Sequence, residues 1–220
     1  MVLPYPISFA ICEPTRQSPS PKANLLGNLH FTVAYIGRLH KEKGVDLIPE
    51  IARIVMDKNK NIKFSIFGDG PERQNLELRS KNLKLENSIR FFGWQNNLEN
   101  IYSSIDILLL PSQEESFPQV ALDTMAFGIP VVATDVGGVF ELVENNKTGI
   151  LIKNRTPETF ANAILSIVED NHRYQYFSEN SKTKATDFSV EKMINNVDAI
   201  YEIATSPPSC FRKKAGGLSQ

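Results

Sequence analysis

Short apolar runs rich in β-branched and aromatic residues recur along the chain, and most of them end at a glycine or a proline. Runs of this length and composition are typical of strands. Between them, apolar residues recur at three- and four-residue intervals, the spacing of one face of a helix. The pattern predicts strands at 31–36, 62–67, 89–92, 105–110, 130–133 and 149–152. It predicts helices at 45–56, 72–83, 97–103, 119–127, 139–143, 156–168, 173–184 and 190–203.

This alternation of strands and helices predicts the fold class. It indicates an α/β fold with a single doubly wound parallel sheet of about six strands, similar to a Rossmann fold. The runs at 107–110 and 129–133 are apolar almost throughout, as expected of strands that are covered on both faces. Ligands on such sheets bind beyond the carboxyl ends of the strands. A binding site is therefore expected in the loops that follow residues 36, 67, 92, 110 and 133.

The two ends of the chain differ from the part between them. Five of the 13 prolines lie within the first 21 residues, so residues 1–29 are expected to form an irregular leader. Residues 206–220 carry basic residues, no acids and a pair of glycines, and are expected to form a flexible tail. Residues 30–205 remain as one domain.

Composition narrows the classes of function. The 220 residues include 24 Lys and Arg against 25 Asp and Glu, for a net charge of -1, which argues against a strongly basic nucleic-acid binder. Two cysteines, Cys12 and Cys210, cannot make a disulfide framework, and free thiols in a reducing compartment are expected. There is no apolar run of about 18 residues and no basic segment ahead of an apolar one at the start. We expect a cytoplasmic protein, with peripheral attachment to the inner face of the membrane as a further option.

The loop after the first predicted strand is basic and bounded by two glycines, Gly37 and Gly44. Glycine lets a backbone approach a ligand closely, and the start of the next helix favours anions. Arg38 and Lys43 would then form a phosphate clamp. The alternative is an ordinary solvated basic turn.

The next two loops give weaker signals. Gly68-Asp69-Gly70-Pro71 lacks the third glycine of a dinucleotide fingerprint, so it does not predict NAD binding. Trp94, the only tryptophan, follows the third predicted strand. It could form the wall of a pocket for a nucleobase, or it could be an ordinary packing residue.

Two carboxylates lie eight residues apart around the loop after the fourth strand. Glu115 precedes the predicted helix 119–127, and Asp123 lies within its second turn. Carboxylates accept hydrogen bonds from paired hydroxyls, so both could contact a polyhydroxyl ligand. The alternative is that Glu115 complements the helix dipole and Asp123 is a surface residue. Asp123 stands in an apolar stretch, however, and burying a carboxylate without a partner is costly, which favours a function.

The sequence contains no recognisable metal or nucleophile motif. The three histidines, His30, His40 and His172, are scattered, and no Asp-x-Asp pair is present to hold Mg²⁺ against a diphosphate. A Gly-x-Ser-x-Gly nucleophile elbow is also lacking. We therefore expect no bound metal.

The loops taken in order resemble a known family. They carry Gly37-Arg38-Leu39 with Lys43-Gly44, Gly68-Asp69-Gly70-Pro71, Phe92-Gly93-Trp94, Pro111-Ser112 with Glu115-Ser116-Phe117, and the segment 123–134 with Gly137-Gly138 and Glu141. This set resembles the C-terminal, donor-binding domain of the group-1 (family 4) retaining glycosyltransferases, which have the GT-B fold. The resemblance covers residues 31–204 and would make the chain one half of a GT-B enzyme.

The resemblance implies transfer of a sugar from a nucleotide-sugar donor, with retention and without metal or a separate cofactor. The donor could be of UDP, GDP or ADP type, and the acceptor a sugar or a lipid-linked sugar. Such enzymes build surface polysaccharides or glycolipids. The acceptor-binding half has no counterpart in this sequence, because only 30 residues precede the first strand. A fragment, a split gene product or a half supplied with an acceptor domain by another chain would each account for this.

The resemblance also implies roles for particular residues. Arg38 and Lys43, next to Gly37, would hold the diphosphate and stabilise the charge that develops on it. Glu115 would face the transferred sugar, and Asp123 the ribose. The remaining implied contacts are backbone near Trp94 and Leu98 for the base, and the backbone N–H groups of Phe117 and Gln119 for the sugar or diphosphate.

Two residues depart from the family pattern. Asp123 is one methylene shorter than the usual Glu, so a backbone group or a water would have to close the gap to the ribose. Pro118 replaces the usual glycine after Phe117, which removes a backbone donor.

Other functions remain as alternatives. One is a non-catalytic module that binds a nucleotide or nucleotide-sugar and acts on a partner. Others are a different GT-B enzyme, such as an epimerase or a phosphorylase, and an unrelated α/β domain with no nucleotide affinity.

Overall fold

The computed structural model describes residues 30–205, so the predicted leader and tail, together with Cys12 and Cys210, lie outside the described residues. Its strands are β1 (Phe31–Ile36), β2 (Ile62–Phe67), β3 (Ile89–Gly93), β4 (Ile107–Leu110), β5 (Val131–Thr134) and β6 (Gly149–Ile152). They form one parallel sheet in the order β3-β2-β1-β4-β5-β6. The predicted fold class is confirmed: the order reverses between β1 and β4, as in doubly wound sheets.

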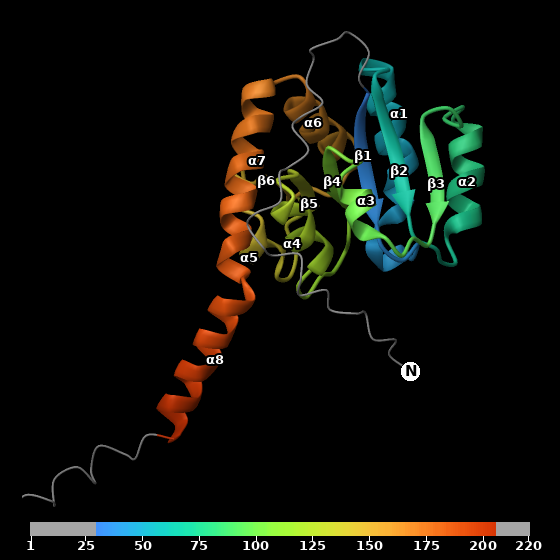
Figure 1. Cartoon of the computed structure of the whole chain (residues 1–220). Helices are drawn as coiled ribbons and strands as arrows, with labels where there is room; N and C mark the ends of the chain where they lie inside the picture. The colour runs from blue at the N-terminus through green and yellow to red at the C-terminus, as the bar shows by residue number, and fades with distance from the viewer. Residues whose placement is uncertain (1–29, 206–220) are drawn as a thin grey trace, which may run out of the picture.

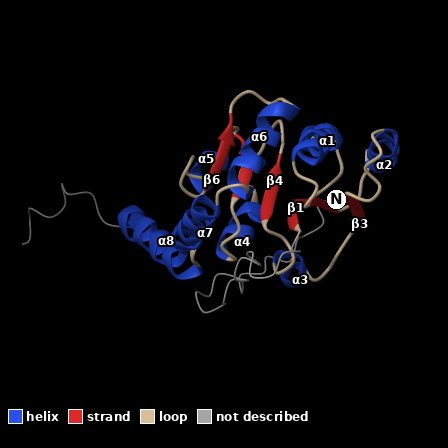
Figure 2. Ribbon diagram, turned by 90° about the horizontal axis from the view of Figure 1, so that it is seen from above, coloured by secondary structure: helices blue, strands red, loops and turns tan. Residues whose placement is uncertain are grey.

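Helices cover both faces of this sheet (Figure 1). They are α1 (Ile48–Lys58), α2 (Arg73–Asn82), α3 (Leu98–Tyr102), α4 (Gln119–Ala126), α5 (Val139–Leu142), α6 (Pro157–Val168), α7 (Asn171–Ala185) and α8 (Val190–Thr205). Figure 2 shows α1, α2 and α6 on one side of the sheet, with α3 and α4 on the other. None of the described helices is both long and apolar enough to cross a membrane.

The central strands are buried on both faces, as their sequence predicts. Every residue of β4 and β5 is buried. One apolar core lies between β1, β2 and the helices α1 and α6. A second lies between β4, β5 and the helices α4 and α5, and a third surrounds α3. These cores fix α3 and α4 against the carboxyl ends of the strands.

The predicted helix 45–56 starts later than expected. Two short 3-10 turns, Lys41–Lys43 and Val45–Leu47, come first, and they are separated by Gly44, whose φ of 65° is left-handed. A side chain at Gly44 would overlap the carbonyl oxygen of Pro111. The chain therefore turns sharply here, which brings the basic loop against the segment that follows β4.

Two strands are also shorter than predicted at their starts. The strand expected from residue 105 begins at Ile107, and just before it the Asp106 carboxylate accepts a hydrogen bond of 2.7 Å from the backbone N–H of Thr32. The strand expected from residue 130 begins at Val131, since Pro130 has no N–H to donate to a neighbouring strand.

Candidate functional site

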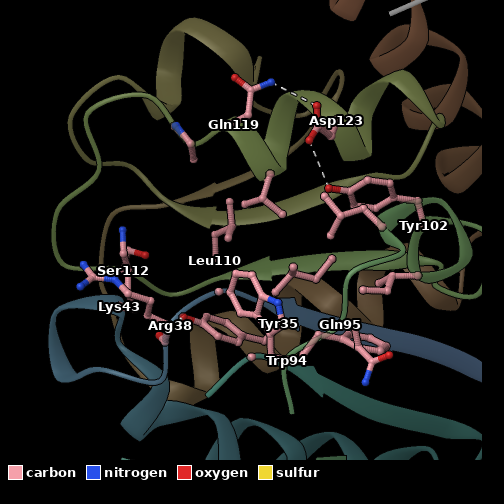
Figure 3. Close-up of a pocket in the computed structure, with 18 of the residues that line it drawn as sticks. Tyr35, Arg38, Lys43, Trp94, Gln95, Tyr102, Leu110, Ser112, Gln119 and Asp123 are labelled. Carbon is pink, nitrogen blue, oxygen red and sulfur yellow. Dashed lines mark hydrogen bonds between the residues drawn. The ribbon is translucent and has the colours of Figure 1, made fainter. Parts of the chain in front are cut away.

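A pocket of about 700 Å³ opens at the carboxyl ends of β1, β2 and β4, between the basic loop and the helices α3 and α4 (Figure 3). This volume lies in the range of small-molecule sites. The structure brings most of the predicted site residues together there. The lining includes Gly37, Arg38, Lys43, Trp94, Leu98, Glu115, Pro118, Gln119 and Asp123.

At one end of the pocket the predicted cation and the predicted acid contact each other. Lys43 Nζ lies 2.8 Å from Glu115 Oε1, and the two side chains are 25% and 11% exposed. The Ser112 hydroxyl donates to the same carboxylate oxygen over 2.7 Å. Glu115 therefore fixes both groups, and a bound anion would have to share Lys43 with it.

Arg38 lies beside this pair on the loop after β1. Its backbone carbonyl accepts a hydrogen bond of 2.7 Å from the hydroxyl of Tyr35, which holds the loop against the strand. The Arg38 residue is exposed, and among residues 30–205 its guanidinium has neither an ion pair nor a hydrogen bond. It can therefore bind an anion without breaking an existing contact.

A pair of glycines after β5 holds the Glu115 loop in place. The Gly138 N–H donates to the Glu115 carbonyl oxygen over 3.0 Å. Gly137 has a φ of 52°, and a Cβ added there would overlap that same carbonyl oxygen. Only glycine gives the left-handed conformation and the close approach together, so these residues set the position of Glu115.

At another part of the pocket, Asp123 is held by two neighbours. It is 8% exposed; Gln119 Nε2 donates to its Oδ1 over 3.1 Å, and the Tyr102 hydroxyl donates to its Oδ2 over 3.2 Å (Figure 3). Burial raises the pKa of the Asp123 carboxyl, and the hydrogen bonds from Gln119 and Tyr102 oppose that rise. The alternative of a surface residue is wrong, and the buried carboxylate has partners within the domain.

An aromatic side chain lies at the edge of the pocket. Trp94 is 60% exposed, and its Nε1–H donates to Asn96 Oδ1 over 2.8 Å. The Gln95 side chain donates to the Phe92 carbonyl oxygen, which ties down the same loop. The ring, held at its polar edge, lines the pocket, and aromatic rings stack on planar ligands.

Phe117 is the predicted site residue that does not line the pocket. Its ring packs instead against Phe188, with 5.6 Å between the ring centroids. The predicted role of its backbone N–H stays a prediction. Pro118 is the N-cap of α4, so the first N–H groups of that helix open toward the pocket lined by Gln119 and Val120.

Sequence reasoning assigned no role to five polar residues that line the pocket: Tyr35, Gln95, Asn96, Tyr102 and Ser112. Ser112 lies three residues before Glu115, a spacing that allows a side-chain contact and could have drawn attention. Tyr35 and Tyr102 carry no comparable signal, because each belongs to a run that reads as core. Within the described part of the chain, no three His, Cys, Asp or Glu side chains lie together as a metal site requires.

Comparison with known proteins identifies the family to which this chain belongs. Residues 19–184 match the model of "Glycosyl transferases group 1". An uncharacterised glycosyltransferase of Haemophilus influenzae is 31% identical over 84% of this chain and 52% of its own length. The N-acetyl-α-D-glucosaminyl L-malate synthase of Bacillus anthracis is 30% identical over 76% of this chain and 44% of its own. The chain thus spans about half the length of these curated relatives.

A solved structure shows the same fold. A mutant of S. aureus TarM, crystallised with fondaparinux, α-GlcNAc-glycerol and UDP, aligns with a TM-score of 0.69 and 25% identity. The alignment covers 78% of this chain and 36% of TarM. The resemblance drawn from the loop motifs is confirmed: this chain belongs to the group 1 glycosyl transferases, and its domain is of the C-terminal type in their GT-B fold.

Proposed function

We propose that this domain binds the nucleotide-sugar donor of a retaining, metal-independent glycosyltransferase. One observation carries the proposal: Arg38, Lys43, Glu115, Trp94 and Asp123, which are far apart in the sequence, line a single pocket. The pocket offers cations for a diphosphate, carboxylates for hydroxyls and an aromatic edge for a base. A nucleoside diphosphate joined to a sugar presents these groups together.

In this proposal the bond that breaks lies at the end of the pocket that binds the diphosphate. When the bond between the anomeric carbon and the phosphate oxygen breaks, the nucleoside diphosphate leaves with the electron pair and gains negative charge. The acceptor hydroxyl oxygen forms the new bond to the anomeric carbon, and its proton passes to the departing phosphate oxygen. Lys43 and Arg38 stabilise the charge on the leaving group, which is the role that a metal ion has in other transferases. Glu115, on the same side, faces the transferred sugar.

The other groups orient the donor. Trp94 and the backbone near Leu98 contact the base, and Asp123 binds the ribose. The N–H groups at the start of α4, from Phe117 to Gln119, approach the sugar or diphosphate. Pro118 gives no N–H there, so its neighbours make these contacts.

The proposal names the donor and the acceptor only by their chemical class. TarM was solved with UDP, which makes UDP-sugars the first donors to test here. The acceptor is a sugar or a lipid-linked sugar, in surface polysaccharide or glycolipid synthesis at the inner face of the membrane. The part of the relatives that this chain does not match would supply the acceptor side, within the same protein or from another chain.

The test is calorimetric titration of the folded chain with UDP, GDP and ADP, without Mg²⁺. The variant Arg38→Ala/Lys43→Ala removes the clamp. Arg53→Ala/Lys60→Ala removes the same charges from exposed positions outside the pocket and serves as the control. Binding of one nucleotide that is lost only in the clamp variant supports the proposal. Equal binding by both variants, or none by the wild type, contradicts it.

A second measurement separates transfer from mere binding. The alternative is a module that binds the nucleotide-sugar and acts on a partner without catalysis. We expect the chain alone to bind nucleotide and to transfer sugar very slowly, and to gain activity with a matching acceptor domain. Lack of transfer in that pairing, with binding intact, favours the module.

A further inference from the structure

The Asp123 carboxylate has an environment that its place in the sequence does not reveal. It projects from the second turn of α4, and each of its oxygens already accepts one hydrogen bond. The donors come from different elements: Gln119 from the first turn of α4, and Tyr102 from the end of α3. All three residues line the pocket (Figure 3).

Of the two donors, Tyr102 is the more firmly held, since Gln119 lies at the exposed start of α4. Gln119 lies four residues before Asp123, so both occupy the same face of α4. A carboxylate only accepts hydrogen bonds, so the Gln119 amide must turn its NH₂ group toward it. Tyr102 is 1% exposed, and its ring packs against Phe127 with 5.1 Å between the centroids. Its hydroxyl therefore cannot follow a carboxylate that rotates away.

An aspartate at this position needs neighbours that fix its orientation more than a glutamate would. Aspartate reaches one methylene less far than glutamate, so only a narrow range of carboxylate orientations can contact a ligand hydroxyl in the pocket. At 8% exposure, little of Asp123 faces the open space. Each carboxylate oxygen retains a second acceptor site once its first is used, so the two donors leave room for two ligand hydroxyls.

We propose that Tyr102 and Gln119 are positioning residues that hold Asp123 in the orientation in which it accepts hydrogen bonds from the ribose hydroxyls of the donor. The inference rests on the proposed function, since it concerns the same nucleotide. It adds two residues, and it explains what holds the shorter acid in one orientation.

The experiment compares each ribonucleotide with its 2′-deoxy counterpart. Titration calorimetry is run with UDP and 2′-deoxy-UDP, and with the GDP and ADP pairs, on the wild type, Tyr102→Phe and Gln119→Met. Both variants keep the size of the side chain and remove the donor. Tyr176→Phe, at an exposed tyrosine of α7, removes the same hydroxyl elsewhere and serves as the control.

We expect the wild type to prefer the ribonucleotide by about tenfold, the effect of one hydrogen bond to a charged group. Tyr102→Phe and Gln119→Met should each reduce that ratio by several-fold and leave the affinity for the deoxynucleotide nearly unchanged. Tyr176→Phe should keep the ratio. A residue that only supports the fold would weaken both ligands equally, so the ratio distinguishes the two roles.

The outcomes separate this inference from the proposed function. If no nucleotide binds, the proposed function fails, and the inference fails with it. If a nucleotide binds but the ratio is near one, or is unchanged in both variants, only the inference is overturned. Should Tyr102→Phe unfold, which a thermal melt would reveal, Gln119→Met at the exposed start of α4 decides alone.

Discussion

The contact between Lys43 and Glu115 leads to a prediction that runs against the usual effect of changing a site residue. Lys43 Nζ, assigned here to the diphosphate, is 2.8 Å from Glu115 Oε1 in the free domain. A bound diphosphate must displace this carboxylate or tolerate its charge nearby. The variant Glu115→Gln removes the charge and keeps the shape, and its amide oxygen can still accept from Ser112 and Lys43. We therefore expect Glu115→Gln to bind a nucleoside diphosphate more tightly than the wild type does.

The geometry gives the magnitude. Two unit charges 4 Å apart interact by about 4 kcal/mol at the effective dielectric constant of a protein surface. Because Lys43 is 25% exposed and Glu115 11%, water and salt reduce this value. We take roughly 1–2 kcal/mol as the gain in binding free energy, which is about 5- to 30-fold in Kd. The transfer rate should fall in the same variant, since Glu115 is proposed to face the transferred sugar.

The assay is titration calorimetry with UDP and with uridine, at low and at physiological salt. UDP should bind Glu115→Gln more tightly, more so at low salt, whereas uridine, which lacks phosphate, should bind as it does to the wild type. Glu114→Gln makes the same charge change at the exposed neighbour outside the pocket and should have little effect. Unchanged or weaker UDP binding by Glu115→Gln would show that the carboxylate does not compete with the diphosphate, and would refute the reasoning.

Three further predictions concern other parts of the pocket. Because burial raises the pKa of the Asp123 carboxyl, its ionised form costs stability once the pH exceeds the ordinary carboxyl value. Asp123→Asn should therefore raise Tm at pH 7.5 by about 2–4 °C, for roughly 1 kcal/mol, and this gain should shrink toward pH 4 in a thermal melt. Gly137→Ala should cost about 2 kcal/mol or more, a fall of roughly 4–8 °C in Tm, because it strains a left-handed residue against the Glu115 carbonyl; an unchanged melt would contradict this. Trp94 is the only tryptophan of the chain and lines the pocket, so its fluorescence should change during a nucleotide titration, and constant emission at saturation would place the ligand away from it.

The fold could be predicted well from the sequence because its signals are local. Each strand is a short apolar run, most of which end where a glycine or proline interrupts them, and the alternation with helices leaves few topologies. The errors fall where distant contacts decide the boundary. Gly44 separates two 3-10 turns ahead of α1, where a side chain would overlap the carbonyl oxygen of Pro111, and the Asp106 carboxylate just before β4 accepts from the N–H of Thr32. Neither contact can be seen in a single sequence.

The charged residues of the site could be predicted from the sequence, but the residues that they contact could not. Arg38, Lys43 and Glu115 could be predicted because they lie in the loops at the carboxyl ends of the strands, where ligands bind in such folds. The ion pair of Lys43 with Glu115 joins residues 72 apart, and the hydrogen bond from Tyr102 to Asp123 joins residues 21 apart. Tyr102 reads as core, because only the packing of α3 beside α4 turns its hydroxyl to the carboxylate.

The two ends of the pocket are built differently, and the proposed reaction gives a reason. Asp123 and Tyr102 are buried and already hydrogen-bonded, whereas Arg38 is exposed and Lys43 lies on a loop between two glycines. The ribose keeps its charge and shape while the sugar is transferred, so a rigid site binds substrate and transition state equally well and affects mainly the affinity. The diphosphate gains negative charge in the same step. Lys43, which can leave Glu115, and the exposed Arg38 can both follow the leaving group and stabilise the transition state more than the substrate, which is where a gain in rate must originate.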